Sequence, residues 1–284
     1  MSRLWEKGLP LDKRVLRYTA GEDHLLDQRL VSYDVRASIA HAEMLAEQNL
    51  LDTGDCEKIC DGLRKLEQDF VAGEWQIELS DEDVHTALES RLTDMIGPAG
   101  GRLHLGRSRN DQVLTALRLY LRDACDEIPA HVLGLSDSLQ RLSDRQGDIA
   151  LPGTTHMQHA MPSSVALWSG GFIEAFDDSI DGLRSAKRRV DKNPLGSAAG
   201  YGTPGLDLDR HATTRKLGFA ETQEPVTAAQ LSRGKGESGL LFEISLVMLD
   251  LSRLASDLLL FYTQEFSYVQ LAAEVTTGSS IMPQ

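Results

Sequence analysis

Apolar residues recur every three or four positions from Leu114 to Leu142, and this stripe constrains the fold more than any other feature of the chain. The spacing is close to a heptad repeat and continues for about four heptads. It predicts one long helix that packs within a bundle. Pro129 lies inside the stripe and is expected to kink or break the helix, because proline has no backbone N–H to donate.

Residues 165–190 and 237–261 are two further long helical candidates. The second is apolar around most of its circumference, so it needs neighbours on several sides, inside a bundle or between subunits. Shorter helical patterns cover residues 35–45, 59–70 and 84–95, and the last two end at Gly73 and at Gly97-Pro98. Residues 75–79 alternate in polarity and predict a short strand or an extended loop.

Strands and helices do not alternate along the chain, which argues against a doubly wound α/β fold. We therefore expect an all-α protein whose long-helix bundle carries a smaller N-terminal helical domain. The boundary is expected near residues 103–110, with a mostly helical domain at 1–105 and a long-helix bundle domain at 106–284.

The net charge of −14 argues against general binding to nucleic acid or anionic membranes. It does not exclude an anionic substrate, because a few arginines can reverse the potential inside a cleft. The N-terminus lacks a signal-peptide core, and no uncharged apolar run reaches about 18 residues. Cys56 and Cys60 are poorly spaced for a disulfide or a zinc site, so we expect three reduced thiols and a cytoplasmic location.

Residues 106–112 form the first of three polar loops, and they precede the longest helical stripe. A helix N-terminus favours an anion, and Arg109 adds a two-pronged donor for a carboxylate while Ser108 and Asn110 add hydrogen-bonding groups. The alternative is a capping loop in which Asn110 or Asp111 is the N-cap and the arginines are solvated.

Residues 152–158 form the second polar loop, which carries Thr155 and His156 between two long helices. Histidine is a natural proton donor or acceptor near neutral pH, although His156 is equally consistent with a hydrogen-bonded structural role. His159 lies three positions further on, but no third residue has metal-ligand spacing, so no metal site is expected.

Two more segments are candidates for chemistry. Ser279 lies in the glycine-led segment 278–284, has no obvious local base, and is alternatively part of a flexible serine pair. His85 opens a helix with an acidic first turn, a pattern that the helix dipole alone explains. His85 and Glu89 are four residues apart, so a pair between them is a further possibility.

Taken together, these loops resemble those of the argininosuccinate lyases, a branch of the fumarase/aspartase superfamily that includes the lens delta-crystallins. Residues 278–284 are similar to the start of the superfamily signature Gly-Ser-Ser-x-Met-Pro-x-Lys-x-Asn, which indicates reaction class more than substrate. Residues 106–112 are more specific to the argininosuccinate branch. Further support comes from residues 27–30, 81–89, 103–119, 152–162 and 194–197.

The resemblance implies cleavage of argininosuccinate to arginine and fumarate without a metal or organic cofactor. It assigns proton transfer to Ser279 and His156, Ser279 as base and His156 as acid or relay, although these roles have been assigned both ways round in the superfamily. It implies that substrate carboxylates are held by Ser108, Arg109, Asn110 and Thr155, and that His85 lines the site. It also implies a homotetramer whose sites are shared between three subunits.

Three departures from the family pattern put the fine substrate contacts in question: Leu105, Asp23, and residues 232–235. Family members also continue beyond the position of Gln284, so we expect the 284-residue form to be inactive or badly impaired. The alternatives are a sibling lyase acting on adenylosuccinate or fumarate, a scaffold of the crystallin kind, and, more remotely, a zinc hydrolase.

Overall fold

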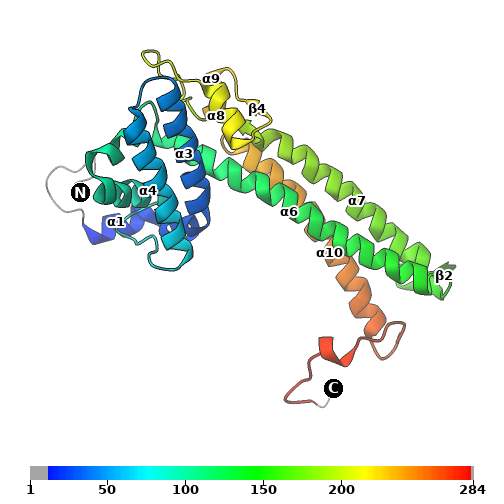
Figure 1. The fold of residues 1–284 in the computed structure, drawn as a ribbon. Coiled ribbons are helices and arrows are strands. Elements are labelled where there is room, and N and C mark those ends of the chain that lie inside the picture. The colour runs from blue at the N-terminus through cyan, green and yellow to red at the C-terminus, as the bar shows by residue number, and fades with distance from the viewer. Residues whose placement is uncertain (1–11, 283–284) are drawn as a thin grey trace. The chain divides into compact units, whose positions relative to one another are not determined.

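The computed structural model describes residues 12–282, most of which are helical (Figure 1). These residues form two compact units. Unit 1 comprises the described residues up to Ala124 together with Lys187–Glu237, and unit 2 comprises Cys125–Ala186 together with those from Ser238 onward. Helix α6, Arg109–Gln146, therefore begins in unit 1 and ends in unit 2. The division into residues 1–105 and 106–284 stays a prediction.

Unit 1 is built from short and medium helices around the start of α6. The parallel strands β3 and β4 pair Lys192 with Glu221 and Asn193 with Thr222. The elements are α1 Lys13–Ala20, α2 Asp23–Leu26, η1 Asp27–Leu30, α3 Val31–Glu47, α4 Thr53–Val71, α5 Val84–Ile96, η2 Gly97–His104, β3 Lys192–Asn193, α8 Arg210–Leu217, β4 Glu221–Thr222 and α9 Val226–Leu231.

Helices α4 and α5 begin and end with the signals that their sequence contains. The Asp52 carboxylate accepts from the Gly54 N–H at 2.9 Å, and the Asp83 carboxylate accepts from the Thr86 N–H at 2.7 Å. Such side chains satisfy backbone N–H groups that have no partner inside the helix. Gly73 and Gly97 follow the two helices with φ values of 77° and 74°. The predicted stops of both helices are therefore confirmed.

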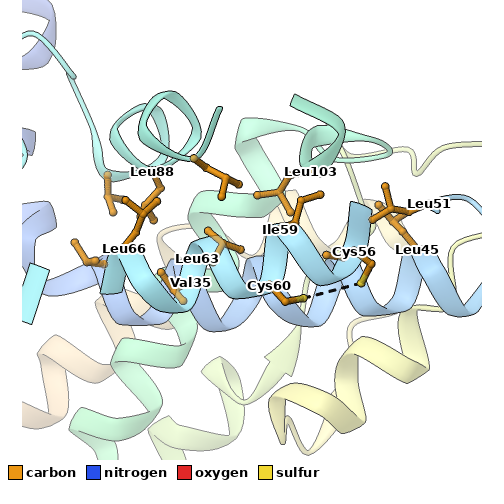
Figure 2. Packing of buried hydrophobic residues seen from close by; sticks show 14 of the residues in the cluster. Val35, Leu45, Leu51, Cys56, Ile59, Cys60, Leu63, Leu66, Leu88 and Leu103 are labelled. Carbon is orange, nitrogen blue, oxygen red and sulfur yellow. Dashed lines mark hydrogen bonds between the residues drawn. The ribbon is translucent and has the colours of Figure 1, made fainter. Parts of the chain in front are cut away.

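The aliphatic core of unit 1 lies between α3, α4, α5 and η2. Figure 2 shows Leu88 and Leu103 lying over the face of α4 that carries Ile59 and Leu63. Ile59 and Leu63 have no exposed surface. The face of α4 that the apolar spacing predicts is therefore the face that the core buries.

Gly62 of α4 faces side chains of α5. A β-carbon at this position would lie 2.6 Å from Cδ1 of Leu92, whereas a β-carbon at Gly134 of α6 would meet nothing within 4 Å. We expect Gly62→Ala to lower the free energy of unfolding by about 1–3 kcal/mol through overpacking. Gly134→Ala is the control and should raise it by about 0.5–1 kcal/mol. Urea denaturation checks both, and a stabilising Gly62→Ala would contradict the packing.

Unit 2 contains the long helices that the sequence predicts. They are the remainder of α6, α7 at Val165–Val190 and α10 at Lys235–Tyr262, followed by the short helix η3 at Ala273–Val275. Helix α6 continues through Pro129, so the helix is not broken there, and the alternative of a kink stays a prediction. Proline removes only one backbone hydrogen bond, and buried side chains on both sides, including Cys125 and Val132, hold the helix in place.

A β-hairpin, not foreseen from the sequence, joins α6 to α7 and lies at the end of these helices (Figure 1). Strand β1, Ala150–Thr155, pairs antiparallel with β2, Gln158–Ser164, with an irregularity between Gly153 and Thr154. The turn residues His156 and Met157 have φ values of 53° and 59°. Positive φ at both positions is typical of the type I′ turn that closes a two-residue hairpin.

Helices α7 and α10 pack through polar and aromatic side chains. The Trp168 indole N–H donates to Asp257 Oδ2 at 2.9 Å, and its ring lies 5.6 Å from that of Phe261. Along its length, α10 also exposes several large apolar side chains: Leu241, Phe242, Met248, Leu249 and Leu259. The expectation that α10 needs further neighbours therefore stays open. Of the helices described, none combines the length and apolar character needed to cross a membrane.

Candidate active site

Residues 106–112, which we call the anion loop, end in a reciprocal cap on α6. Ser108 Oγ accepts from the Asn110 N–H at 3.3 Å, and Asp111 Oδ1 accepts from the Ser108 N–H at 2.9 Å. This resembles a capping box: the residue before the helix accepts from the second helical residue, and the third helical residue accepts from the backbone N–H of the cap. Ser108 is therefore the cap, and the alternative of Asn110 or Asp111 as N-cap is wrong.

The second Asp111 oxygen ties the anion loop to a distant segment. Oδ2 accepts from the Gly196 N–H at 2.9 Å and from the Ala198 N–H at 2.8 Å. Asp111 has no exposed surface. Burial raises the pKa of its carboxyl, while the hydrogen bonds from Ser108, Ala198 and Gly196 and the charge of Arg107 act against that rise. Asp111 thus fixes the position of the loop by donors on two segments.

Arg107 points inward. Its side chain donates from Nη1 to Ser38 Oγ at 2.9 Å, and the residue is 8% exposed. Burial lowers the pKa of the guanidinium, and the nearby carboxylates of Asp34 and Asp111 oppose that change. The alternative in which the loop arginines are solvated is therefore wrong for Arg107, which neutralises buried acids beneath the loop.

Arg109, the predicted carboxylate binder, is accessible and lies against α5. Its guanidinium is 3.8 Å from Asp83 Oδ1 and 3.9 Å from Glu89 Oε2, and Nη2 donates to Thr86 Oγ1 at 3.3 Å. Its side chain is 38% exposed, so solvent weakens both ion pairs. A carboxylate arriving at the helix N-terminus would compete with these two acids for Arg109.

His85 lies close behind this surface and is 1% exposed. Its Nδ1 is 2.9 Å from Oδ2 of Asp34 on α3. The predicted pair between His85 and Glu89 is wrong, because His85 faces α3 while Glu89 turns toward Arg109. Sequence reasoning missed Asp34, although an acid inside the apolar pattern of α3 was a usable signal.

The departures from the family pattern lie in different surroundings. Arg233 donates to the backbone oxygen of Asn110 at 3.2 Å, so the segment 232–235 contacts the anion loop directly. The Leu105 carbonyl accepts from Nε2 of His41 at 2.8 Å. Burial lowers the pKa of His41 to about 3, so this imidazole is neutral. Asp23 is exposed in the first turn of α2.

The other predicted site residues belong to unit 2. Thr155 and His156 are exposed at the hairpin tip, and Ser279 is exposed in the segment after η3. Ser279 Oγ accepts from the N–H groups of Ile281 and Met282 at 3.2 Å and 3.1 Å. Within residues 12–282, no hydrogen bond or ion pair joins Ser279 to His156. The structure thus brings Ser108, Arg109 and Asn110 together beside α5, the helix that carries His85.

The extended segment before α5 is held by η1. Gln28 donates to the Ile77 carbonyl at 3.1 Å and accepts from the Ile77 N–H at 3.3 Å, so residues 75–79 form an extended loop and not a strand. Asp27 Oδ2 accepts from the Val84 N–H at 3.1 Å. Burial is the main reason that the pKa of Asp27 rises from 3.8 to about 6.

This raised pKa predicts a pH-dependent effect of Asp27→Asn. The folded protein binds the Asp27 proton more tightly than the unfolded chain, so the associated stability is complete below pH 3.8 and is lost as the pH rises through about 6. Asparagine stays neutral and keeps an acceptor for Val84. The variant should therefore have a higher Tm than wild type at about pH 7.5, with the difference closing near pH 4. Calorimetry at several pH values checks this, and a pH-independent difference would contradict it.

Among the described residues, no group of three or more His, Cys, Asp or Glu side chains is arranged to hold a metal ion. His156 and His159 therefore have no third ligand within residues 12–282. The chemistry available at the site comes from the guanidinium of Arg109, the hydroxyl of Ser108, the amide of Asn110 and the start of α6. These groups suit an anionic ligand.

Long helices and a hairpin between α6 and α7 make up an all-α fold of the kind seen in solved fumarate lyases. The chain aligns with an EDDS lyase variant solved with bound fumarate at a TM-score of 0.84 and 27% identity, over 98% of this chain and 55% of that one. A delta-crystallin-like fumarate lyase from Brucella melitensis, bound to cobalt, shares the fold at a TM-score of 0.74 and 18% identity, over 91% of this chain and 61% of that one.

The lyase family model matches residues 12–284, and the chain belongs to this family. Argininosuccinate lyase of Sorangium cellulosum is 45% identical over 282 residues, which are 99% of this chain and 65% of that protein. The enzyme of Thermotoga neapolitana is 41% identical over 99% of this chain and 70% of its own length. The chain thus spans about two thirds of the length of these curated relatives.

Proposed function

We propose that the protein is an argininosuccinate lyase, which eliminates fumarate from argininosuccinate and releases arginine for arginine biosynthesis. The observation that carries this proposal is 41–45% identity to argininosuccinate lyases over 99% of the chain. The anion loop supports it, because Arg109 and the start of α6 suit a substrate that bears carboxylates. The reaction breaks one C–N bond, and it needs a base for the carbon-bound proton and an acid for the leaving nitrogen.

The proposed site assigns these proton transfers to Ser279 and His156. Ser108, Arg109, Asn110 and Thr155 would hold carboxylates, and His85 would line the pocket. Because Ser279 and His156 are exposed and lack a contact with each other in the described chain, the proposal includes a homotetramer in which subunits share sites. The exposed apolar side chains of α10 support such an assembly. The unbridged thiols of Cys56, Cys60 and Cys125 suit a cytoplasmic location.

The decisive experiment measures fumarate release from argininosuccinate by the protein produced from its complete gene. Adenylosuccinate serves as a second substrate, and hydration of fumarate to malate is measured in parallel. Turnover of argininosuccinate alone is the expected result. Turnover of only adenylosuccinate or fumarate would instead identify a sibling lyase, and a folded assembly that turns over none of them would favour a scaffold of the crystallin kind.

A sibling specificity has one observation in its favour. Arg233 contacts the backbone of Asn110, and segment 232–235 departs from the family pattern at this place. A change beside the anion loop can alter which amine leaves while the fumarate half of the substrate is bound as before. The EDDS lyase variant, whose structure contains fumarate, is accordingly a reason to include an aminocarboxylate such as EDDS among the substrates tested.

A further inference from the structure

Gln112 lies between the guanidinium of Arg109 and the carboxylate of Asp34. Its Nε2 is 3.3 Å from both Oδ1 and Oδ2 of Asp34, and its Oε1 accepts from Nη1 of Arg109 at 3.5 Å. Gln112 is 3% exposed. A carboxylate only accepts and a guanidinium only donates, so the two partners together allow a single orientation of the Gln112 amide.

Asp34 holds His85 on the other side. The His85 Nδ1 is 2.9 Å from Asp34 Oδ2, and Asp34 has no exposed surface. If the Asp34 carboxylate accepts this hydrogen bond, His85 carries a proton on Nδ1, and Nε2 is the ring nitrogen that points away from Asp34. Ser38 Oγ donates to Asp34 Oδ1 at 3.4 Å and accepts from Arg107 at 2.9 Å. Burial raises the pKa of Asp34, and Arg107, Gln112, Arg109 and Ser38 oppose that rise. Both Asp34 oxygens have donors from Gln112 or Ser38 beside them, the arrangement that suits an acceptor.

These contacts form one polar chain, Arg109–Gln112–Asp34–His85, whose two inner members are buried. We propose that Gln112 and Asp34 are positioning residues that transmit a change at Arg109 to the imidazole of His85. An anion at Arg109 would draw the guanidinium away from Gln112. The Gln112 amide and the Asp34 carboxylate would then shift, and the His85 ring would change its orientation with them. The catalytic significance of this coupling rests on the proposed function, in which Arg109 and His85 both face the substrate.

The test is a double-mutant cycle read by NMR of the full chain with labelled histidine rings. The His85 signal is identified by its loss in His85→Asn. Arg109→Met should shift the His85 ring resonances in the wild-type background and shift them at least about fivefold less in Gln112→Met, which keeps the length of the side chain without its polar ends. Gln140→Ala is the control, because Gln140 is exposed on the same helix and should leave the His85 signal unchanged.

Equal shifts in both backgrounds would overturn the proposal and would assign the coupling to Thr86, which also contacts Arg109. An unchanged His85 signal in Gln112→Met would overturn it as well. If Gln112→Met does not fold, Gln112→Glu replaces it, because glutamate keeps an acceptor for Arg109 but turns a carboxylate oxygen toward Asp34 in place of the donor and so breaks the Asp34 end of the chain.

Because the NMR cycle needs no turnover, its failure is separate from failure of the proposed function. In the active enzyme, Gln112→Met should lower kcat by about 10²-fold through a displaced His85 and change KM by less than about tenfold. If Gln112→Met lowers the stability of the protein but leaves the His85 ring resonances unchanged, Gln112 has a purely structural role and the proposal is contradicted.

Discussion

Replacing Asp111 with alanine is expected to lower the free energy of unfolding by about 3–5 kcal/mol. The carboxylate accepts from three backbone N–H groups, those of Ser108, Gly196 and Ala198, at 2.8–2.9 Å. Alanine would leave these donors without an acceptor in a position that has no exposed surface. Urea unfolding followed by circular dichroism measures the loss.

Two further variants show whether the acceptor or the mere presence of a side chain matters. Asp137→Ala changes an exposed aspartate on the same helix and should alter stability by less than about 0.5 kcal/mol. Asp111→Asn keeps one acceptor oxygen but turns an NH₂ group toward at least one N–H, so its loss should be intermediate. An Asp111→Ala protein with the urea midpoint of wild type would show that the three hydrogen bonds do not hold the loop.

His156→Asn and Ser279→Ala should each lower the turnover of argininosuccinate by about 10²–10⁴-fold, the usual contribution of a proton-transfer group. The fall should lie mainly in kcat, because both residues are proposed to act on the reacting atoms and the carboxylates are held elsewhere. Steady-state fumarate release by the assembled enzyme measures both effects. Each residue is exposed in the described chain, so neither change should unfold the protein.

His159→Asn and Ser280→Ala are the matched controls for these variants. Both residues are exposed neighbours of the same type, in β2 and in the segment after η3. They should keep turnover within about threefold of wild type, because neither is assigned a proton transfer. Rates that fall equally in the controls and in the test variants would place the chemistry somewhere other than His156 and Ser279.

The helices could be predicted because their signals are local. Ile59 and Leu63 share a face of α4 by spacing alone, and Asp52, Gly73 and Gly97 act on backbone groups within a few residues. The hairpin could not be predicted in the same way. Its turn holds His156 and Met157 at positive φ, where glycine or asparagine is the usual signal.

The buried polar groups under the anion loop were harder to predict than its exposed ones. Arg109 and Ser108 could be chosen as candidates because a helix start with an arginine suits an anion whatever surrounds it. Arg107 and Asp34 depend on partners 69 and 51 residues away along the chain, Ser38 and His85, and single-sequence spacing carries no information on such pairs. The capping-loop alternative therefore placed Arg107 in solvent, whereas the fold buries it beside Asp34 and Asp111.

Unit 1 is built from two separate stretches of the chain, and this affects the order in which its contacts can form during translation. The carboxylate of Asp111 cannot accept from the Ala198 N–H until that residue has been synthesised, and Ala198 is 87 residues later in the chain. At about 5–20 residues per second, translation needs roughly 4–17 s to bring that partner out after Asp111 itself. Until Ala198 has been synthesised, the nascent anion loop therefore has only its local cap, the contact of Asp111 with Ser108.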